Sequence, residues 1–294
     1  MASEQDVELM GLYWTVAGPV EVHVGREWSL FDFADRCEQA ARVGFSGIGV
    51  WHADLEHVLE KRSLAEMKQI LDANGLEHLE LEFLMDWFVD EGDAARVESD
   101  RIRALLLEAA GALGAHHIKV GNIPGTACEL SRLTERYAEL CAEAAGRTDA
   151  KVVYEFMPFD VNADSLESAR AVVEGAGAPN GGLAIDTWHM SKLGIAPDDL
   201  RAIDPRYLSW VELSDGMVEN MPDLIEETTG HRLLPGEGEF DLPGYVEVCR
   251  DLGYDGPWGV EVLSDDLRAL PMEQIFERAY ETTAAQFRPP AGAA

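Results

Sequence analysis

The stretch "GGLAIDTWHMSKLG", residues 181–194, contains the pattern that decides the fold. Its apolar residues 183–185 predict a buried strand, which ends at Asp186, and His189 follows three residues later. Seven more apolar runs of strand type occur along the chain, and segments with a helical apolar period separate them. These runs are residues 12–18, 47–52, 78–84, 116–122, 151–158, 208–216 and 257–263.

Strict alternation of strands and helices predicts a parallel sheet, because each parallel connection needs a crossover helix. Eight such units in 294 residues match the count and size of a (β/α)8 TIM barrel, with residues 1–294 as a single domain. A doubly wound sheet of eight strands is the alternative. The tail at about 288–294 is expected to be disordered. Long connections at 85–98 and 216–241 are expected to form lids or oligomer contacts, which leaves a homo-oligomer open.

Composition and charge narrow the class of protein. The formal net charge is −32, and only five of the 23 basic residues are lysines, so nucleic acid and anionic membranes are poor partners. No window approaches the roughly 20 apolar residues of a membrane span. The first residues lack the pattern of a signal peptide, and the four cysteines form no CxxC pair. We therefore expect a cytoplasmic protein with reduced cysteines.

Acidic residues stand near the carboxyl ends of the last four predicted strands, which places them on one side of the barrel mouth: Glu155, Asp186, Glu212 and Glu261. Carboxylates this close repel one another, and burying them costs several kcal/mol each unless a cation compensates. The nearby His189 and Arg232 cannot balance four charges. The sequence therefore predicts one divalent metal ion, Mn²⁺ or Mg²⁺ by the chemistry of oxygen ligands, with Co²⁺ tolerated.

The earlier strands contribute further candidates for the mouth. His52 follows Trp51 at a strand end and is a candidate substrate contact. Lys119 is a second candidate substrate contact on these strands, expected to neutralise an acidic group or to bind a carboxylate, and Glu82 is expected to point into the mouth. Aromatic residues at the strand ends offer an apolar face for a sugar or cyclitol ring.

Three segments resemble a known family: "VVYEFMPF" (152–159), "IDTWHM" (185–190) and "RLLPGEGEFDLPGYVEVCRDLGYDGPWGVEVL" (232–263). They are similar to the xylose isomerase-like sugar isomerase/epimerase superfamily. That group includes ketose 3-epimerases, hydroxypyruvate isomerase, 2-keto-myo-inositol dehydratase, 3-dehydroshikimate dehydratase and, more distantly, endonuclease IV. The resemblance covers nearly the whole chain.

The resemblance implies a metal held by Glu, Asp, His and Glu on strands five to eight, where Glu155, Asp186 and Glu261 match. Glu212 in "VELSDG" replaces the usual histidine. Either Glu212 completes an all-carboxylate set of the kind that xylose isomerase uses, or the site is altered. The resemblance also implies that His189 and Arg232 bind substrate oxygens. Glu237 in "PGEG" is expected to form a loop salt bridge.

The predicted function is a metal-dependent isomerase or epimerase of a small non-phosphorylated sugar or keto-polyol. Glu155 and Glu261, on opposite sides of the metal, would pass a proton through an enediolate intermediate. A dehydratase of a keto-inositol or related keto acid is the first alternative. A non-catalytic barrel that binds a sugar or a partner is the second, and DNA repair is disfavoured by charge. Motifs for ATP, NAD and serine-hydrolase chemistry are absent from the sequence.

Overall fold

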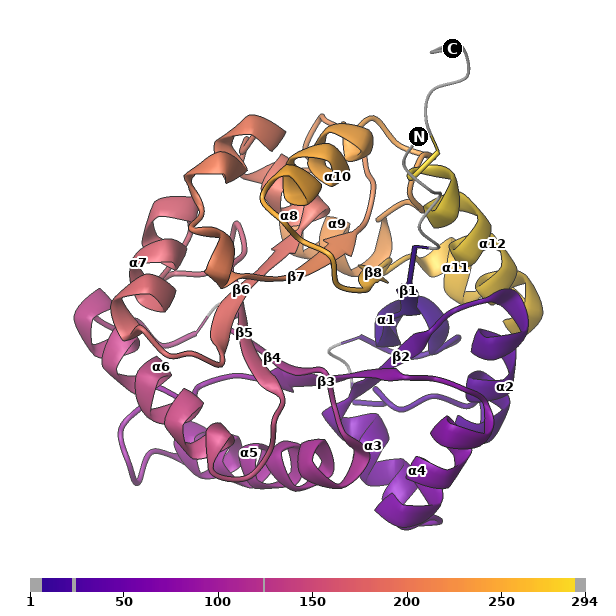
Figure 1. Cartoon of the computed structure of the whole chain (residues 1–294), viewed down its shortest axis with the longest axis horizontal. Helices are drawn as coiled ribbons and strands as arrows, with labels where there is room; N and C mark the ends of the chain where they lie inside the picture. The colour runs from indigo at the N-terminus through magenta and orange to yellow at the C-terminus, as the bar shows by residue number, and fades with distance from the viewer. Residues whose placement is uncertain (1–6, 23–24, 124, 289–294) are drawn as a thin grey trace.

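A computed structural model describes residues 7–22, 25–123 and 125–288. Within these segments eight parallel strands, β1 to β8, close into a barrel in chain order, which confirms the predicted TIM barrel (Figure 1). Apart from Arg288, the predicted disordered tail lies outside the described residues. The strands are β1 Leu9–Gly11, β2 Gly47–Trp51, β3 His78–Leu84, β4 His117–Gly121, β5 Lys151–Glu155, β6 Gly181–Asp186, β7 Leu208–Leu213 and β8 Trp258–Val260.

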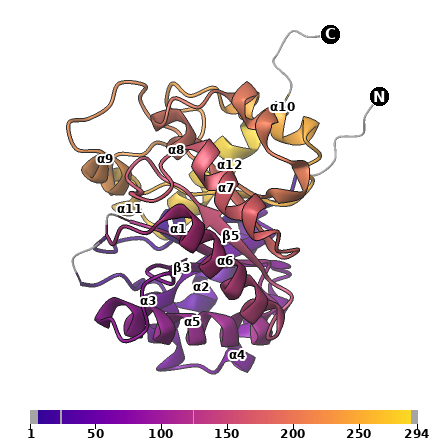
Figure 2. The same ribbon diagram turned by 90° about the vertical axis from the view of Figure 1, so that its left-hand side faces the viewer.

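Helices form an outer ring around the strands (Figure 1). In Figure 2, α9 and α11 lie close together at one end of the barrel, and an antiparallel bridge between His231 and Ser264 joins their loops. The α-helices are α1 Tyr13–Val16, α2 Phe33–Val43, α3 His52–Leu59, α4 Leu64–Ala73, α5 Ala94–Leu113, α6 Leu130–Ala145, α7 Leu166–Ala176, α8 Thr187–Lys192, α9 Leu224–Gly230, α10 Leu242–Asp251, α11 Asp265–Arg268 and α12 Met272–Ala285. Two 3-10 helices, η1 Pro197–Ala202 and η2 Pro205–Tyr207, precede β7.

Local sequence explains where several helices begin and end. Asp32 caps α2 by accepting a hydrogen bond from Ala34 N, and α2 ends at Gly44 in the left-handed conformation. Ser63 begins α4 with a capping box in which its side chain and that of Glu66 exchange hydrogen bonds with the backbone. These caps satisfy the backbone groups that a helix end leaves unpaired.

The first strand was predicted at the wrong residues. β1 is Leu9–Gly11, and the predicted run 12–18 instead contains the short helix α1. A short apolar run does not distinguish a strand from a buried helix. Here Thr15 stabilises the short helix, because its Oγ1 donates to Val260 O and accepts from Val262 N, which ties α1 to the end of β8. Six of the other predicted runs contain their strands, and the sixth run, 182–189, contains β6 except for its first residue, Gly181. The connection 216–241 contains α9.

The barrel interior carries polar side chains in layers. Residues two apart on a strand face the same side, so Glu80 and Glu82 of β3 share a face, as do His117 and Lys119 of β4. All four side chains are fully buried. The alternate residues of these strands, such as Leu79, pack in the core beneath the helices. The barrel therefore has an apolar outer face and an interior that combines charged residues with a small apolar cluster of Met10, Leu12, Val153, Ala184 and Trp210.

Two further expectations can be compared with the structure. Cys37, Cys141 and Cys249 are buried and free, as predicted, and Cys128 is free and partly buried. In the described part of the chain, no helix combines the length and apolarity that a membrane crossing requires.

A buried ion pair between α2 and α3 provides the first prediction. Arg36 Nη2 donates to Asp54 Oδ2 at 2.6 Å, and both side chains are inaccessible to solvent. Replacing Arg36 with methionine leaves the Asp54 charge buried, so we expect Arg36→Met to lower the free energy of unfolding by about 3–5 kcal/mol. Urea unfolding followed by circular dichroism measures this loss.

A matched control lies on the same helix. Arg42 pairs with Glu277 at 3.0 Å, but both side chains are nearly half exposed. Arg42→Met should therefore cost no more than about 1 kcal/mol. Equal losses in the two variants would contradict the importance of the buried pair.

Candidate active site and metal centre

The four predicted carboxylates meet at one end of the barrel. Glu155 and Asp186 are the last residues of β5 and β6, Glu212 lies in β7, and Glu261 directly follows β8. All four are buried, and one carboxylate oxygen of each lies within 4.8 Å of the others. The strand ends thus place four acids in one buried group, which we call the carboxylate ring.

Two cations contact this ring within the described residues. Lys119 Nζ donates to Glu212 Oε1 at 2.9 Å and to Glu261 Oε1 at 2.6 Å. Arg232 Nη1 donates to Asp186 Oδ2 at 2.7 Å and lies 3.4 Å from Glu261 Oε2. The Arg232 guanidinium also stacks over the Trp188 ring at 4.9 Å. Glu261 therefore bridges the two cations.

Even so, negative charge dominates the barrel interior. Glu80 and Glu82 add two buried carboxylates beside the ring, so six carboxylates face Lys119 and Arg232. Glu212 Oε2 is buried and accepts no hydrogen bond from any described residue, and the nearest cationic partner of Glu155 Oε1 is His189 Nε2 at 3.4 Å. A buried acceptor without a partner costs about 1–3 kcal/mol. Oxygen donors of this kind fit a hard divalent ion.

Burial shifts the acidities of these groups in different directions. It raises the pKa of Glu80 and of Glu261 to about 7, although Lys119 opposes the shift in both. Burial and the neighbouring Glu261 also raise the pKa of Glu212 well above its usual range. Burial acts the same way on Glu155, but Lys119 and His189 outweigh it and lower its pKa to about 2.

A pocket that is partly open to solvent lies over the ring. Its polar wall includes Glu82, Glu155, His189, Arg232 and Glu261. The rest is mainly apolar, and the rings of Trp14 and Trp51 lie 4.8 Å apart within it. A pocket with an apolar wall and a few convergent polar groups is typical of a site for a small molecule.

The model of the xylose isomerase-like TIM barrel family matches residues 37–286. The chain belongs to this family.

Proteins similar to this chain are named for different activities. The chain is 25% identical over 244 residues to a 3-dehydroshikimate dehydratase of Pseudomonas putida, a match of 82% of this chain and 37% of that protein. It is 24% identical over 252 residues to an inosose isomerase of Halalkalibacterium halodurans, covering 84% and 88% of the two chains. The chain thus spans little more than a third of the length of the dehydratase that it matches.

Solved structures show the same family fold. The IolI protein with a bound zinc atom aligns at a TM-score of 0.75 and 18% identity, over 95% of this chain and 97% of that one. A D-allulose 3-epimerase from Methylomonas sp. in complex with D-allulose aligns at 0.71 and 18% identity, over 96% and 97%. At these identities the likeness establishes the barrel fold.

Not every predicted substrate contact of this family member lies on the pocket wall. His189 and Arg232 do, but His52 and Lys119 are not among the lining residues. Trp51 lines the pocket in place of His52, whose Nδ1 accepts a hydrogen bond from Phe83 N at 3.4 Å. Lys119 faces the carboxylates, which agrees with the expectation that it neutralises acidic groups. Glu237 forms the predicted loop salt bridge, at 2.6 Å to Arg278.

Sequence reasoning missed Glu80 and His117, which lie deeper in the barrel. His117 Nε2 is 2.7 Å from Glu80 Oε2, and His117 Nδ1 is 2.8 Å from His116 Nδ1. Burial lowers the pKa of His116 and of His117, which favours the neutral form of each imidazole. The alternation of acid and leucine in "HLELEFL" was the available signal, since it places Glu80 on the same face as Glu82.

Asp215 was also missed, and it organises the loop that carries Arg232. Its buried carboxylate accepts four backbone hydrogen bonds, at 2.8–3.1 Å, from Gly216, Gly236, Gly238 and Phe240. A Cβ on Gly238 would come within 2.3 Å of Asp215 Oδ1, so the glycine permits this approach. Arg232 N donates to Leu263 O at 3.1 Å, which ties the loop to the segment after β8.

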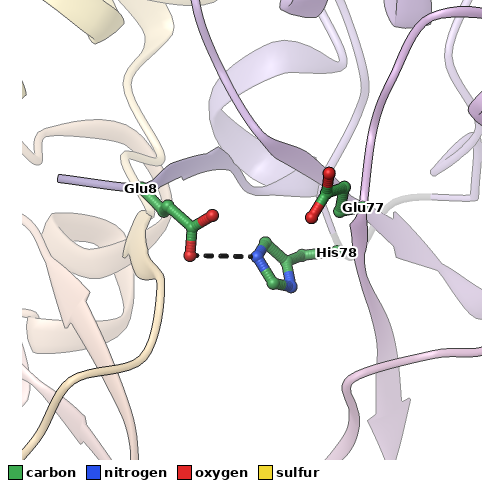
Figure 3. Close-up of side chains that lie close together, drawn as sticks. All are labelled: Glu8, Glu77 and His78. Atoms are coloured by element: carbon green, nitrogen blue, oxygen red, sulfur yellow. Dashed lines mark hydrogen bonds and ion pairs between the residues drawn. The ribbon is translucent and has the colours of Figure 1, made fainter. Parts of the chain in front are cut away.

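A separate group of possible ligands lies near the amino-terminal ends of the strands. Figure 3 shows Glu8, Glu77 and His78, with His78 Nε2 3.3 Å from Glu8 Oε2. Both glutamates are exposed, and the end of a TIM barrel that carries active sites is the opposite one. We assign no function to this group.

The Asp215 contacts predict a specific effect on the loop. In Asp215→Asn the amide nitrogen cannot accept hydrogen bonds from the backbone, so the segment 216–240 should open more often. With at least one contact worth about 1 kcal/mol lost, we expect protease cleavage in this segment to be at least about fivefold faster. Limited proteolysis with mass spectrometry of the fragments measures the rate.

The control for this experiment is Asp255→Asn, which changes an exposed aspartate of the same chain. It should be cleaved at the wild-type rate. Unchanged cleavage of Asp215→Asn would mean that the four contacts do not hold the loop.

Proposed function

We propose that the chain is a divalent-metal-dependent isomerase or epimerase of a small, non-phosphorylated keto-sugar or keto-polyol. The observation that carries the proposal is the meeting of Glu155 and Glu261 at the wall of a largely apolar pocket. Two carboxylates that face one small substrate can remove and return a proton. The inosose isomerase and the D-allulose epimerase among the relatives support this class of substrate.

The ion would be held by Glu155, Asp186, Glu212 and Glu261, and Mn²⁺ or Mg²⁺ suits this oxygen set best. When bound, such an ion polarises a carbonyl oxygen and makes the adjacent carbon–hydrogen bond more acidic. Asp186 is fixed for this role because its two oxygens accept hydrogen bonds from Trp188 N and Arg232 Nη1.

The protein's own side chains would carry the proton transfer. One of Glu155 and Glu261 takes the proton from the carbon beside the carbonyl, and the other returns a proton to a neighbouring carbon or to the opposite face. His189 lies in the pocket wall, and its Nε2 is 3.4 Å from Glu155 Oε1 and 3.5 Å from Asp186 Oδ2. The side chain would therefore contact a substrate oxygen that lies beside the carboxylate ring.

The pocket also indicates what the substrate lacks. Arg232 is the only lysine or arginine that lines it among the described residues, and Asp186 already binds its guanidinium. A phosphate group would enter beside three carboxylates without a free cation to bind it. The proposal is therefore limited to substrates without phosphate.

A dehydratase is the second candidate. The similarity to 3-dehydroshikimate dehydratases of two Pseudomonas species, at 25% and 27% identity, favours it. The same first step, removal of a proton beside a carbonyl, would then be followed by loss of a β-hydroxyl group as water. Both reactions would use the same site. They differ in the step after proton removal, which is return of a proton in the isomerase or epimerase and loss of the β-hydroxyl group in the dehydratase.

Deuterium exchange tests the proposal. We expect wild-type protein with Mn²⁺, incubated in D₂O with a panel of ketoses and inososes, to place deuterium beside the carbonyl of its substrate. Isomerisation or epimerisation retains the substrate mass apart from deuterium, whereas dehydration removes one water, and mass spectrometry separates the two. Chelation by EDTA should abolish exchange, and Mn²⁺ should restore it.

Variants connect the exchange to the proposed residues. Glu155→Gln and Glu261→Gln should each slow it at least about 100-fold, because an amide cannot accept the proton. Glu237→Gln is the control, since Glu237 lies in an exposed loop salt bridge. Substrate binding without exchange in wild-type protein would favour the non-catalytic barrel instead.

A further inference from the structure

The ammonium group of Lys119 contacts a second group of carboxylates, which lies next to the carboxylate ring. Oxygens of Glu80, Glu82 and Glu261 lie within 4.8 Å of one another, close enough to ligate a metal ion. Lys119 Nζ lies among these same residues, at 3.8 Å from Glu80, 3.1 Å from Glu82 and 2.6 Å from Glu261. The ammonium group also lies 2.9 Å from Glu212 and 3.9 Å from Glu155 of the ring. It therefore lies between the two groups, in space that a second ion would need.

The two groups share one residue. Glu261 belongs both to the carboxylate ring and to the second group, and its Oε1 contacts Lys119 while its Oε2 faces Arg232. Two metal ions bridged by a common carboxylate lie about 3.5–4 Å apart in proteins. The barrel thus contains adjacent cation positions, of which Lys119 fills one.

The chemistry of the second group supports this assignment independently. Glu82 Oε1 is buried and has no hydrogen-bond partner among the described residues, so the ammonium group alone does not satisfy these acids. Strand geometry fixes the arrangement, because Glu80 and Glu82 share the inner face of β3 and Lys119 projects from the neighbouring β4. Removing the ammonium would leave Glu80 and Glu82 without a cation among the described residues and Glu261 with Arg232 alone.

We propose that Lys119 is a built-in cation that occupies a second metal position formed by Glu80, Glu82 and Glu261. It restricts the barrel to a single divalent ion and keeps these carboxylates in place. The inference rests on the proposed metal dependence for the first ion, but it concerns a different set of ligands. Lys119 acts as a positioning residue, not as a substrate contact.

Counting Mn²⁺ ions tests this. Lys119→Ala should bind one more Mn²⁺ ion per chain than wild-type protein, because three carboxylates lose their resident cation. Metal analysis after removal of excess ion gives the count. Electron paramagnetic resonance adds a structural signature, since two adjacent ions are magnetically coupled and a single ion is not. Added methylammonium should enter the space left by the lysine and return the count to the wild-type value.

Two controls accompany the count. Lys151→Ala removes an exposed lysine from β5 and should leave the wild-type count unchanged. If metal-free Lys119→Ala does not fold, the protein is refolded in Mn²⁺ and then freed of excess ion before the count.

The outcomes separate the two proposals. One additional ion in Lys119→Ala supports the role of Lys119, and equal counts in the variant and wild-type protein overturn it. The wild-type count tests the proposed function independently, because protein without any bound ion after Mn²⁺ loading contradicts metal dependence. Wild-type protein with one ion and a variant with one ion would leave the proposed function intact and eliminate the role of Lys119.

Discussion

An excess of buried negative charge is the constraint on which the rest of this barrel depends. Six carboxylates converge inside it, and Lys119 and Arg232 are the cations that contact them in the described segments. Isolated charges cannot be buried at such density without compensation. The outer faces of the strands are apolar and pack under the helices. The inner faces carry the ion pairs, and a small apolar cluster that includes Val153, Ala184 and Trp210 lies beneath the ring.

The position of Arg232 shows how distant segments serve this constraint. The residue lies in the loop after α9, far from the strand that carries Asp186, yet its guanidinium binds Asp186 and stacks on Trp188. Asp215 holds that loop by binding four backbone N–H groups. The Arg232 guanidinium at the carboxylate ring is thus positioned by the backbone contacts of Asp215, which lie outside the ring. Such contacts let a loop hold a side chain in a fixed place.

Much of the fold and the ring could be predicted from the sequence, because both follow from periodicity. Parallel strands share a carboxyl end, so Glu155 and Asp186 had to lie together once their strands were located. β1 was misplaced because the apolar run at 12–18 suits a buried helix as well as a strand. Asp215 and the Glu80–His117 contact were missed because their partners lie far away in the chain. A sequence pattern carries no signal for such pairings.

The central claim is that the carboxylate ring binds one divalent ion. Anomalous diffraction from crystals grown with Mn²⁺ tests it most directly, because the signal locates the metal without assumptions about activity. The account predicts one strong peak per chain, at about 2.0–2.6 Å from oxygens of Glu155, Asp186, Glu212 and Glu261. An empty ring, or a peak only at the exposed group of Glu8, Glu77 and His78, would contradict it.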